Sequence, residues 1–72
     1  MEKFGERLRK LRGEKGLTQK QMADLFDLSL RAYQTYEYGE NYPIFVKLIA
    51  LVDYFDVSLD YLVGRSNIRE RR

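Results

Sequence analysis

The first fifteen residues combine apolar and basic side chains at helical spacing. Phe4, Leu8 and Leu11 are separated by four and three residues, and arginine and lysine lie between them. This spacing places the apolar side chains on one face of a helix. Gly16 follows at a point where helices often end in a left-handed residue. The pattern predicts an amphipathic helix over about residues 3–14.

Two short helices joined by a tight turn are predicted next. Thr18 and Gln21 form a capping-box pattern, in which the threonine hydroxyl accepts from the Gln21 amide and the glutamine side chain returns to the Thr18 amide. The apolar stripe that follows ends at Asp27, and Ser29 is a favourable N-cap for a further helix running to Tyr38. Because only two residues separate the two helices, they must cross at a steep angle.

The second half of the chain predicts two more helices. Pro43 is expected to open the first of them at a first-turn position, because its fixed φ suits a helix start. The apolar stripe of that helix is expected to comprise Phe45, Leu48, Ile49 and Val52. Asp56 ends it, and Ser58 caps a last short helix that closes at Gly64. Five helices without a strand signal predict an all-α domain over residues 1–64.

Basic side chains gather at the two ends of the chain. The net charge is +2, yet residues 1–15 carry +3, residues 16–64 carry −4 and residues 65–72 carry +3. Basic ends can meet phosphates, but they are equally consistent with a solvated helix face and a frayed terminus. We expect residues 65–72 to form a basic, disordered tail.

The composition excludes several classes of function. With no cysteine and no histidine, the chain can form no disulfide, thiolate zinc site, imidazole metal site or serine–histidine pair. No set of acid, base and nucleophile can be assembled, so we expect neither an enzyme nor a cofactor or metal. No apolar run approaches the ~20 residues of a membrane span, and the first residues lack the apolar stretch of a signal peptide. The expectation is therefore a cytoplasmic protein without membrane contact or a small-molecule ligand.

Four segments of the chain resemble one family of regulators. They are residues 4–12 (FGERLRKLR), 16–23 (GLTQKQMA), 36–39 (YEYG) and 54–64 (YFDVSLDYLVG). In order and spacing they are similar to the phage-repressor and Cro-type (XRE) helix-turn-helix family, over about residues 3–66. The resemblance implies a compact five-helix, lambda-repressor-like fold. It also implies a sequence-specific DNA-binding transcriptional regulator, with repression as the expected mode of action.

The resemblance further implies which side chains meet double-stranded operator DNA. The helix at Leu30–Tyr38 would lie in the major groove. Arg31 would pair with guanine and Gln34 with adenine, while Leu30 and Thr35 would contact thymine methyl groups. The residues expected to contact DNA phosphates are Gln19, Lys20, Tyr38 and Tyr42.

Each of these roles has an alternative that the sequence leaves open. Arg31, Gln34 and Gln19 are also consistent with ordinary solvent-facing positions on short helices. Six tyrosines can suggest base stacking, but helical spacing favours packing in the core for Tyr33, Tyr36, Tyr54 and Tyr61. Tyr38 and Tyr42 are expected to be exposed.

One pair of charged residues is expected to be structural. Arg12 and Glu37 match positions at which the family forms a mostly buried ion pair between its first and third helices. Removing one partner of a buried pair leaves an uncompensated charge, which costs about 3–5 kcal/mol.

Two departures from the family pattern concern the turns and the loop after the recognition helix. Asp27 and Asp56 stand where glycine is common, and aspartate tolerates the left-handed conformation better than most residues. The loop at residues 40–42 has no lysine or arginine to contact phosphates. Electrostatic affinity for DNA is therefore expected to be low and to depend on Arg31, Lys20 and the first helix.

A third departure from the family pattern places apolar residues at positions that are usually polar. Ile44 and Val46 stand where relatives usually have a polar cap and an acidic residue. Together with Tyr42 they can form an exposed apolar patch of the kind that marks a protein contact. Alternatively they pack locally under the tail, and the sequence does not decide between the two.

Two functional hypotheses follow. The favoured one is a homodimer that places two recognition helices about 34 Å apart on a pseudo-palindromic operator. It is either a minimal regulator or the DNA-binding part of a longer repressor or antitoxin. The alternative is a protein-interaction module on the same fold, antitoxin-like or anti-repressor, with weak or lost DNA binding. Its contacts would come from Leu30, Tyr42, Ile44 and Val46.

Overall fold

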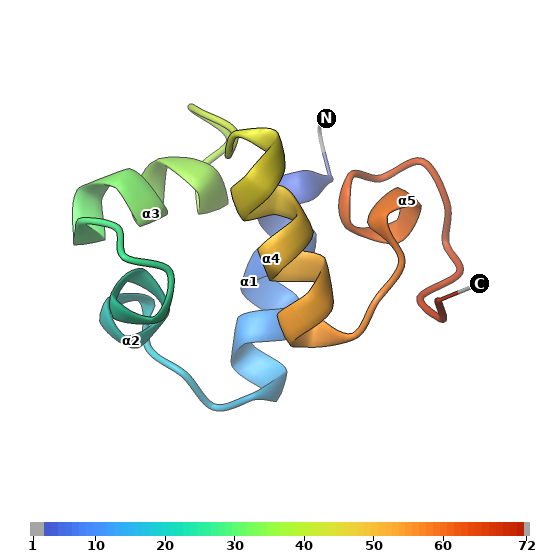
Figure 1. Cartoon of the computed structure of the whole chain (residues 1–72), viewed down its shortest axis with the longest axis horizontal. Helices are drawn as coiled ribbons and strands as arrows, with labels where there is room; N and C mark the ends of the chain where they lie inside the picture. The colour runs from blue at the N-terminus through green and yellow to red at the C-terminus, as the bar shows by residue number, and fades with distance from the viewer. Residues whose placement is uncertain (1–2, 72) are drawn as a thin grey trace.

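The computed structural model describes residues 3–71 and contains five helices and no strand within that range (Figure 1). In chain order the helices are α1 (Phe4–Glu14), α2 (Gln19–Leu25), α3 (Leu30–Glu37), α4 (Phe45–Phe55) and α5 (Leu59–Leu62). α2 and α3 lie together at one end of the long axis, α1 and α4 cross its middle, and α5 lies at the other end (Figure 1). The all-α, five-helix expectation is confirmed.

Three of the helices begin at the hydroxyl caps that the sequence indicated. The Thr18 hydroxyl accepts from the Gln21 amide at 3.0 Å, and the Gln21 side chain accepts from the Thr18 amide at 2.8 Å. The hydroxyls of Ser29 and Ser58 each accept from the backbone amide three residues later, at 3.1 and 3.0 Å. Each cap satisfies a backbone donor that the first turn of a helix leaves without an intrahelical partner.

The helix ends also follow local signals. Gly16 has a φ of +68°, and Asp27 and Asp56 have φ values of +56° and +55°. Both aspartates therefore occupy the left-handed region in which glycine is common, as the departures from the family pattern predicted.

A single core joins the helices. Its fully buried members include Phe4, Leu8 and Leu11 of α1, Met22 of α2, Tyr33 of α3 and Leu62 of α5. α1 and α3 approach each other closely at Gly5, where a Cβ atom would lie 2.4 Å from the carbonyl oxygen of Glu37. Real Cβ atoms essentially never come so close to another heavy atom, so only glycine fits between these helices without moving them.

α4 differs from its prediction in where it begins and in which residues it buries. Its first residue is Phe45 and its N-cap is Ile44, so Pro43 precedes the helix instead of occupying its first turn. Ile44 provides no side-chain acceptor for the first backbone amides. Phe45 lies on the same stripe as the buried Val52, but two turns earlier, beyond the edge of the core, and it is largely exposed.

Tyr54 was also expected in the core and is instead partly exposed. Its neighbour Phe55 is buried, and successive residues of a helix point about 100° apart. The Tyr54 ring lies edge-on to Phe26 at a centroid distance of 5.7 Å, and the ammonium of Lys15 lies 4.8 Å from its centroid. The other three tyrosines expected in the core are buried: Tyr33, Tyr36 and Tyr61.

The disordered tail was predicted for residues 65–72; residues 65–71 fold back on the domain, and Arg72 lies outside the described residues. Arg69 forms a two-point ion pair with Glu14 of α1, at 3.0 and 2.7 Å. Arg7 donates to the carbonyl oxygen of Ser66 at 2.6 Å. The guanidinium groups of Arg7 and Arg69 also lie 4.3 and 5.7 Å from the ring centroid of Tyr61. The structure thus assigns several tail and α1 charges to contacts within the domain.

Candidate nucleic-acid interface

α2 and α3 are held at their steep angle by the turn between them. The amide of Leu28 donates to the carbonyl oxygen of Ala23 at 2.8 Å, and the half-buried Leu28 side chain packs against the core. Lys47 of α4 donates to the carbonyl oxygen of Phe26 at 2.7 Å, which satisfies an acceptor at the end of α2. The turn is therefore fixed from both sides, and α3 presents a constant outer face.

The four residues predicted to read bases lie on two successive turns of α3. Leu30 and Arg31 are exposed, whereas Gln34 and Thr35 are half-buried. No carboxylate of residues 3–71 pairs with Arg31, so its guanidinium faces solvent with its donors available. The Thr35 hydroxyl donates to the carbonyl oxygen of Ala32 at 2.7 Å, and its methyl group remains a candidate for an apolar contact.

Gln34 is connected to the core by a chain of hydrogen bonds. Its amide nitrogen Nε2 donates to Oε1 of Gln19 at 3.1 Å, and Nε2 of Gln19 donates to Oε1 of Glu37 at 3.1 Å. Glu37 also accepts from the buried hydroxyl of Tyr33 and forms the ion pair with Arg12. We refer to these five residues as the Glu37 network.

The Glu37 carboxylate at the centre of this network is buried, and both of its oxygens accept hydrogen bonds. Nε of Arg12 lies 2.6 Å from Oε2, and Nη2 lies 3.2 Å from Oε1. The Glu37 side chain has no exposed surface, and residues 3–71 contain no buried side-chain polar atom without a partner. A buried charge is tolerated only when it is paired and hydrogen-bonded in this way. The buried ion pair that the resemblance implied is present.

The pKa shifts within the network agree with this geometry. Burial alone would raise the pKa of Glu37, but the hydrogen bonds from Arg12, Tyr33 and Gln19 outweigh it and hold that pKa below its ordinary value. Burial and the adjacent carboxylate raise the pKa of the Tyr33 hydroxyl. The hydrogen bond to Glu37 raises the pKa of Arg12. The ionised carboxylate and the neutral phenol are therefore the stable forms at neutral pH.

The four residues predicted to contact phosphates occupy different environments. Tyr38 and Tyr42 are exposed as expected, and the Tyr42 ring also lies edge-on to Phe4 at 5.9 Å. Lys20 forms an exposed ion pair with Asp24 at 2.8 Å, a kind of pair that contributes little to stability and exchanges readily with water. Gln19 is half-buried and belongs to the Glu37 network, so part of its hydrogen-bonding capacity is already used.

Three features of this site were missed by sequence reasoning. The direct contact between Gln19 and Gln34 joins residues fifteen positions apart, and no local pattern indicates it. The close packing of α1 against α3 at Gly5 was also missed, because only the residue type hinted at it. The contact of Tyr33 with Glu37 could have been found, because residues four apart on a helix share a face.

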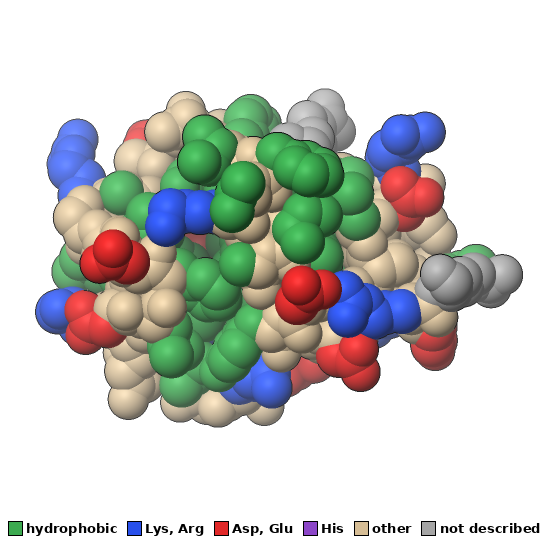
Figure 2. Space-filling view, in the orientation of Figure 1, with side chains coloured by type: hydrophobic (Ala, Val, Ile, Leu, Met, Phe, Trp, Pro, Cys, Tyr) green, Lys and Arg blue, Asp and Glu red, His purple; other side chains and the backbone are tan. Residues whose placement is uncertain are grey.

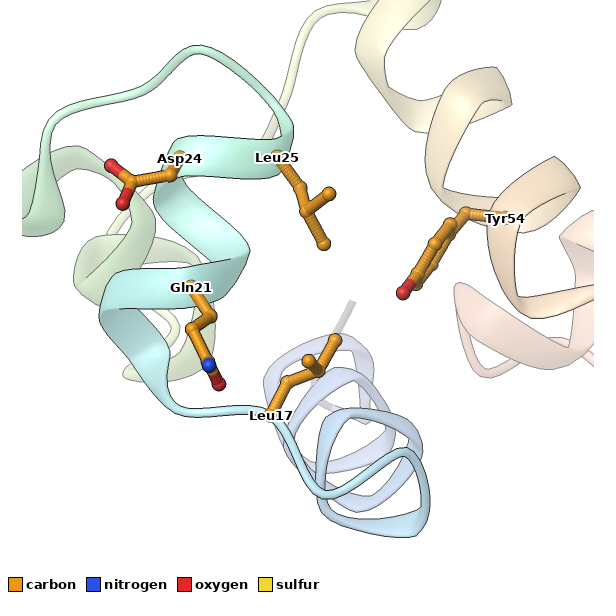
Figure 3. Close-up of a pocket in the computed structure, with 5 residues that line it drawn as sticks. All are labelled: Leu17, Gln21, Asp24, Leu25 and Tyr54. Carbon is orange, nitrogen blue, oxygen red and sulfur yellow. The ribbon is translucent and has the colours of Figure 1, made fainter.

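A shallow apolar hollow of about 450 Å³ lies between α2 and α4. Figure 3 shows Leu17, Leu25 and Tyr54 pointing toward this space and Asp24 pointing away from it. Nothing in its lining combines a nucleophile with a base, and no three acidic side chains of residues 3–71 gather to hold a metal ion. No helix in this range has the length and apolar character needed to cross a membrane.

Comparison with known proteins identifies the family. A family model described as "Helix-turn-helix domain" matches residues 5–68. The chain belongs to the XRE-type helix-turn-helix family. This membership confirms the resemblance stated from the sequence, and the five helices are consistent with the lambda-repressor-like fold.

Several relatives of this XRE-type chain are transcriptional regulators by name. It is 46% identical over 65 residues to the uncharacterized HTH-type transcriptional regulator YqaE of Bacillus subtilis, which covers 89% of this chain and 56% of YqaE. It is 41% identical over 63 residues to the cryptic phage CTXphi transcriptional repressor RstR of Vibrio cholerae, covering 88% and 56% respectively. The HTH-type transcriptional activator BcrR of Enterococcus faecalis is 36% identical over 61 residues, covering 85% and 30%.

The chain spans about half the length of the first two relatives. These relatives are named as regulators and not as enzymes. No solved structure gives a significant match.

Proposed function

We propose that this chain is a sequence-specific DNA-binding domain that represses transcription by placing α3 in the major groove of an operator. The observation that carries the proposal is the outer face of α3. Arg31, which pairs with no carboxylate of residues 3–71, lies there one turn before Gln34, and the Gln34 amide is held in place by the Glu37 network. Side chains fixed before binding lose less conformational freedom in the complex, which favours both affinity and specificity.

Each base-reading residue has a role suited to its chemistry. The guanidinium of Arg31 can donate two parallel hydrogen bonds to O6 and N7 of guanine, which is the most common specific contact in protein–DNA complexes. The amide of Gln34 pairs with adenine. Leu30 and the Thr35 methyl group contact the C5-methyl group of thymine. Repression as the mode of action is supported by the similarity to RstR, a named repressor.

Phosphate contacts position the domain but supply only a modest electrostatic attraction. We assign them to Lys20, Tyr38, Tyr42 and the outer side of Gln19. The loop after α3 carries Glu40 and no basic residue. Because each neutralised phosphate steepens the salt dependence of binding, we expect this domain to show a shallow salt dependence.

The test begins with selection of a bound site from random double-stranded DNA, followed by titrations of that site over a salt series. Arg31→Ala should weaken binding about 5–150-fold at the selected site, since a good bidentate pair contributes about 1–3 kcal/mol of discrimination. Arg65→Ala is the matched control, because it removes the same charge from an exposed position near α5, away from α3.

Equal losses for Arg31→Ala and Arg65→Ala would mean that α3 does not read bases. The absence of any selected sequence, for a folded protein at low salt, would contradict DNA binding altogether. Circular dichroism of both variants establishes that they are folded.

A second candidate function is favoured by one observation. Ile44, Phe45 and Val46 at the start of α4 are 69%, 68% and 73% exposed. A protein-interaction module on this fold, antitoxin-like or anti-repressor, would use such a surface and could have lost DNA binding. It predicts capture of a distinct protein partner together with no selected DNA sequence, a pair of results opposite to that expected of the repressor.

A further inference from the structure

The turn between α2 and α3 occurs a second time in the chain, between α4 and α5. Residues 26–30 (FDLSL) and 55–59 (FDVSL) differ at one position. In each turn the aspartate has a positive φ, and the next amide donates to the carbonyl oxygen five residues earlier, at 2.8 Å from Leu28 and 3.2 Å from Val57. The serine hydroxyl then caps the following helix. Local sequence is therefore sufficient to form this turn.

The two turns differ in how the core anchors them. At the α4–α5 turn both apolar side chains are buried, since Phe55 is 7% exposed and Val57 is 2% exposed. At the α2–α3 turn the corresponding Phe26 and Leu28 are only half-buried. Apolar burial resists the movement of a turn, because movement would expose the side chains to water. The turn that leads into α3 thus has the weaker apolar anchor.

Lys47 of α4 supplies a second anchor at this less buried turn. Its ammonium lies 2.7 Å from the carbonyl oxygen of Phe26. α2 has no basic residue in its own last turn, so the cation that suits the carbonyl end of a helix comes from α4. None of the side chains in residues 3–71 that donate to a backbone carbonyl reaches the equivalent oxygen of Phe55. The lysine contact therefore distinguishes the turn before α3.

Lys47 is an uncommon residue type for its surroundings. It is the only basic residue between positions 32 and 64. Figure 2 shows hydrophobic side chains over the start of α4 and over the region between α2 and α4, with few charged groups among them. Lys47 is half-buried and pairs with no carboxylate of residues 3–71. Within that range the bond to Phe26 is the one hydrogen bond of its ammonium.

Tyr54 of α4 contacts the same phenylalanine through its ring. The two rings lie edge-on at a centroid distance of 5.7 Å. Lys47 and Tyr54 are seven residues apart, which places them on one face of α4, two turns from each other. One face of α4 therefore contacts Phe26 at its backbone and at its ring. α3 begins at Leu30, four residues after Phe26, so this contact lies at the base of the recognition helix.

We infer that Lys47 is a positioning residue for base reading, which fixes α3 relative to the core through the Phe26 carbonyl oxygen and not through a DNA phosphate. The inference rests on the proposed function. Arg31 needs a fixed orientation to donate two parallel hydrogen bonds to guanine, whereas non-specific affinity comes from charge and depends less on orientation. Loss of the Lys47 contact should therefore lower discrimination between DNA sequences and leave general DNA affinity nearly unchanged.

Titrations of the selected operator and of unrelated DNA over a salt series test this role. Lys47→Met keeps the apolar stem and removes the donor, and it should weaken operator binding by about 5-fold or more through misplaced base contacts. Its binding to unrelated DNA should stay within about 2-fold of the wild-type value, with the same salt slope. Lys47→Arg retains a cationic donor and should keep most of the operator affinity.

Lys20→Met provides the comparison, because Lys20 is assigned to a phosphate contact. It should weaken binding to both DNAs and reduce the slope of log K against log salt by ~0.9. Lys47→Met behaving in the same way would make Lys47 a phosphate contact and overturn the inference. Unchanged operator affinity in Lys47→Met, or an equal loss in Lys47→Arg, would also overturn it. Circular dichroism sets a temperature at which every variant is folded.

Amide hydrogen exchange of the DNA-free protein separates this inference from the proposed function. In Lys47→Met the Leu28 amide should exchange about 5-fold faster or more, whereas the Val57 amide of the matched turn should change by less than about 2-fold. Equal acceleration of both amides would indicate a general loss of stability and overturn the inference. Selective acceleration at Leu28 in a chain that selects no DNA would contradict the proposed function and leave the anchor in place. Selection of DNA by a chain whose Leu28 exchange is unaffected in Lys47→Met would do the reverse.

Discussion

The α2–α3 unit and α4 differ in how their polar and apolar groups are matched. In α2 and α3 each helix start has a hydroxyl cap, and the interior acid Glu37 has a partner for each oxygen. α4 begins without a cap and exposes Ile44, Phe45 and Val46. The α2–α3 unit satisfies its buried charge within the domain, whereas the start of α4 exposes three consecutive apolar side chains. The difference shows that α3 is fixed by contacts within the domain, whereas those contacts do not account for the exposed side chains at the start of α4.

Removal of the Glu37 carboxylate from the α2–α3 unit should cause the largest loss of stability. Glu37→Ala leaves the Arg12 charge and the Tyr33 hydroxyl without their partner, and we expect a loss of about 3–5 kcal/mol in the free energy of unfolding. For a domain of this size that corresponds to a fall of roughly 15–30 °C in melting temperature. Glu40→Ala, an exposed acid three residues later, is the control. A melting temperature unchanged by Glu37→Ala would show that the network is not structural.

Acid should destabilise the fold through protonation of Glu37 in the α2–α3 unit. The pKa of Glu37 is lower in the folded chain than its ordinary value of 4.5, so its ionisation stabilises the fold at pH values above 4.5. That contribution is lost progressively as the pH falls below 4.5 toward the folded-state pKa. Urea denaturation between pH 7 and 2 measures it, and Glu37→Gln should flatten the profile. A profile equally steep in Glu37→Gln would assign the acid sensitivity to other carboxylates.

A comparison of Gly5→Ala with Gly13→Ala should distinguish the effect of the close α1–α3 contact from that of ordinary helix propensity. The added methyl group would meet the Glu37 carbonyl oxygen at 2.4 Å, and overpacking of this kind costs about 1–3 kcal/mol. Gly13→Ala in the same helix meets nothing within 4 Å and should instead stabilise the domain by about 0.5–1 kcal/mol. Thermal melts of the two variants should therefore shift in opposite directions, and shifts of the same sign would contradict the tight α1–α3 packing.

Changes at the helix N-caps should produce the smallest effects on stability. Removing the cap of α3 and adding one to α4 should have effects of opposite sign. Ser29→Ala removes the hydroxyl that accepts from the Ala32 amide and should lower the free energy of unfolding by about 1 kcal/mol. Ile44→Ser supplies a cap that α4 lacks and should raise it by up to a similar amount at monomeric concentrations. Chemical denaturation of both variants gives the two values. A loss of stability in Ile44→Ser would show that Ile44 already contributes to the monomer.

The parts of the fold that could be predicted from the sequence are those with local causes. Thr18, Ser29 and Ser58 cap their helices because a hydroxyl reaches an amide only three residues away. The left-handed turns at Asp27 and Asp56 are similarly local. The pairing of Arg12 with Glu37 is not local, and it could be anticipated only through the resemblance to the XRE-type family.

The failures have non-local causes. Helical spacing placed Phe45 on the apolar stripe of α4. It could not show that the core does not extend to the first turn of α4, where Phe45 is exposed. Composition suggested disorder for residues 65–72, since it cannot reveal that the guanidinium groups of Arg7 and Arg69 both lie near the Tyr61 ring. The roles of the base-reading residues remain a prediction, because only a DNA complex or its binding energies can test them.

The contact between Gln19 and Gln34 has a directional consequence. An ionised carboxylate can only accept, so Glu37 requires Gln19 to turn its Nε2 inward and its carbonyl oxygen toward Gln34. Gln34 must then turn its own Nε2 toward Gln19. The charge in the core thus orients two neutral amides in succession, and the last of them keeps one hydrogen and its carbonyl oxygen for the outside. One donor beside one acceptor is the complement of the major-groove edge of adenine, so in the proposed complex the base preference of Gln34 depends on Gln19 and Glu37 as well as on Gln34 itself.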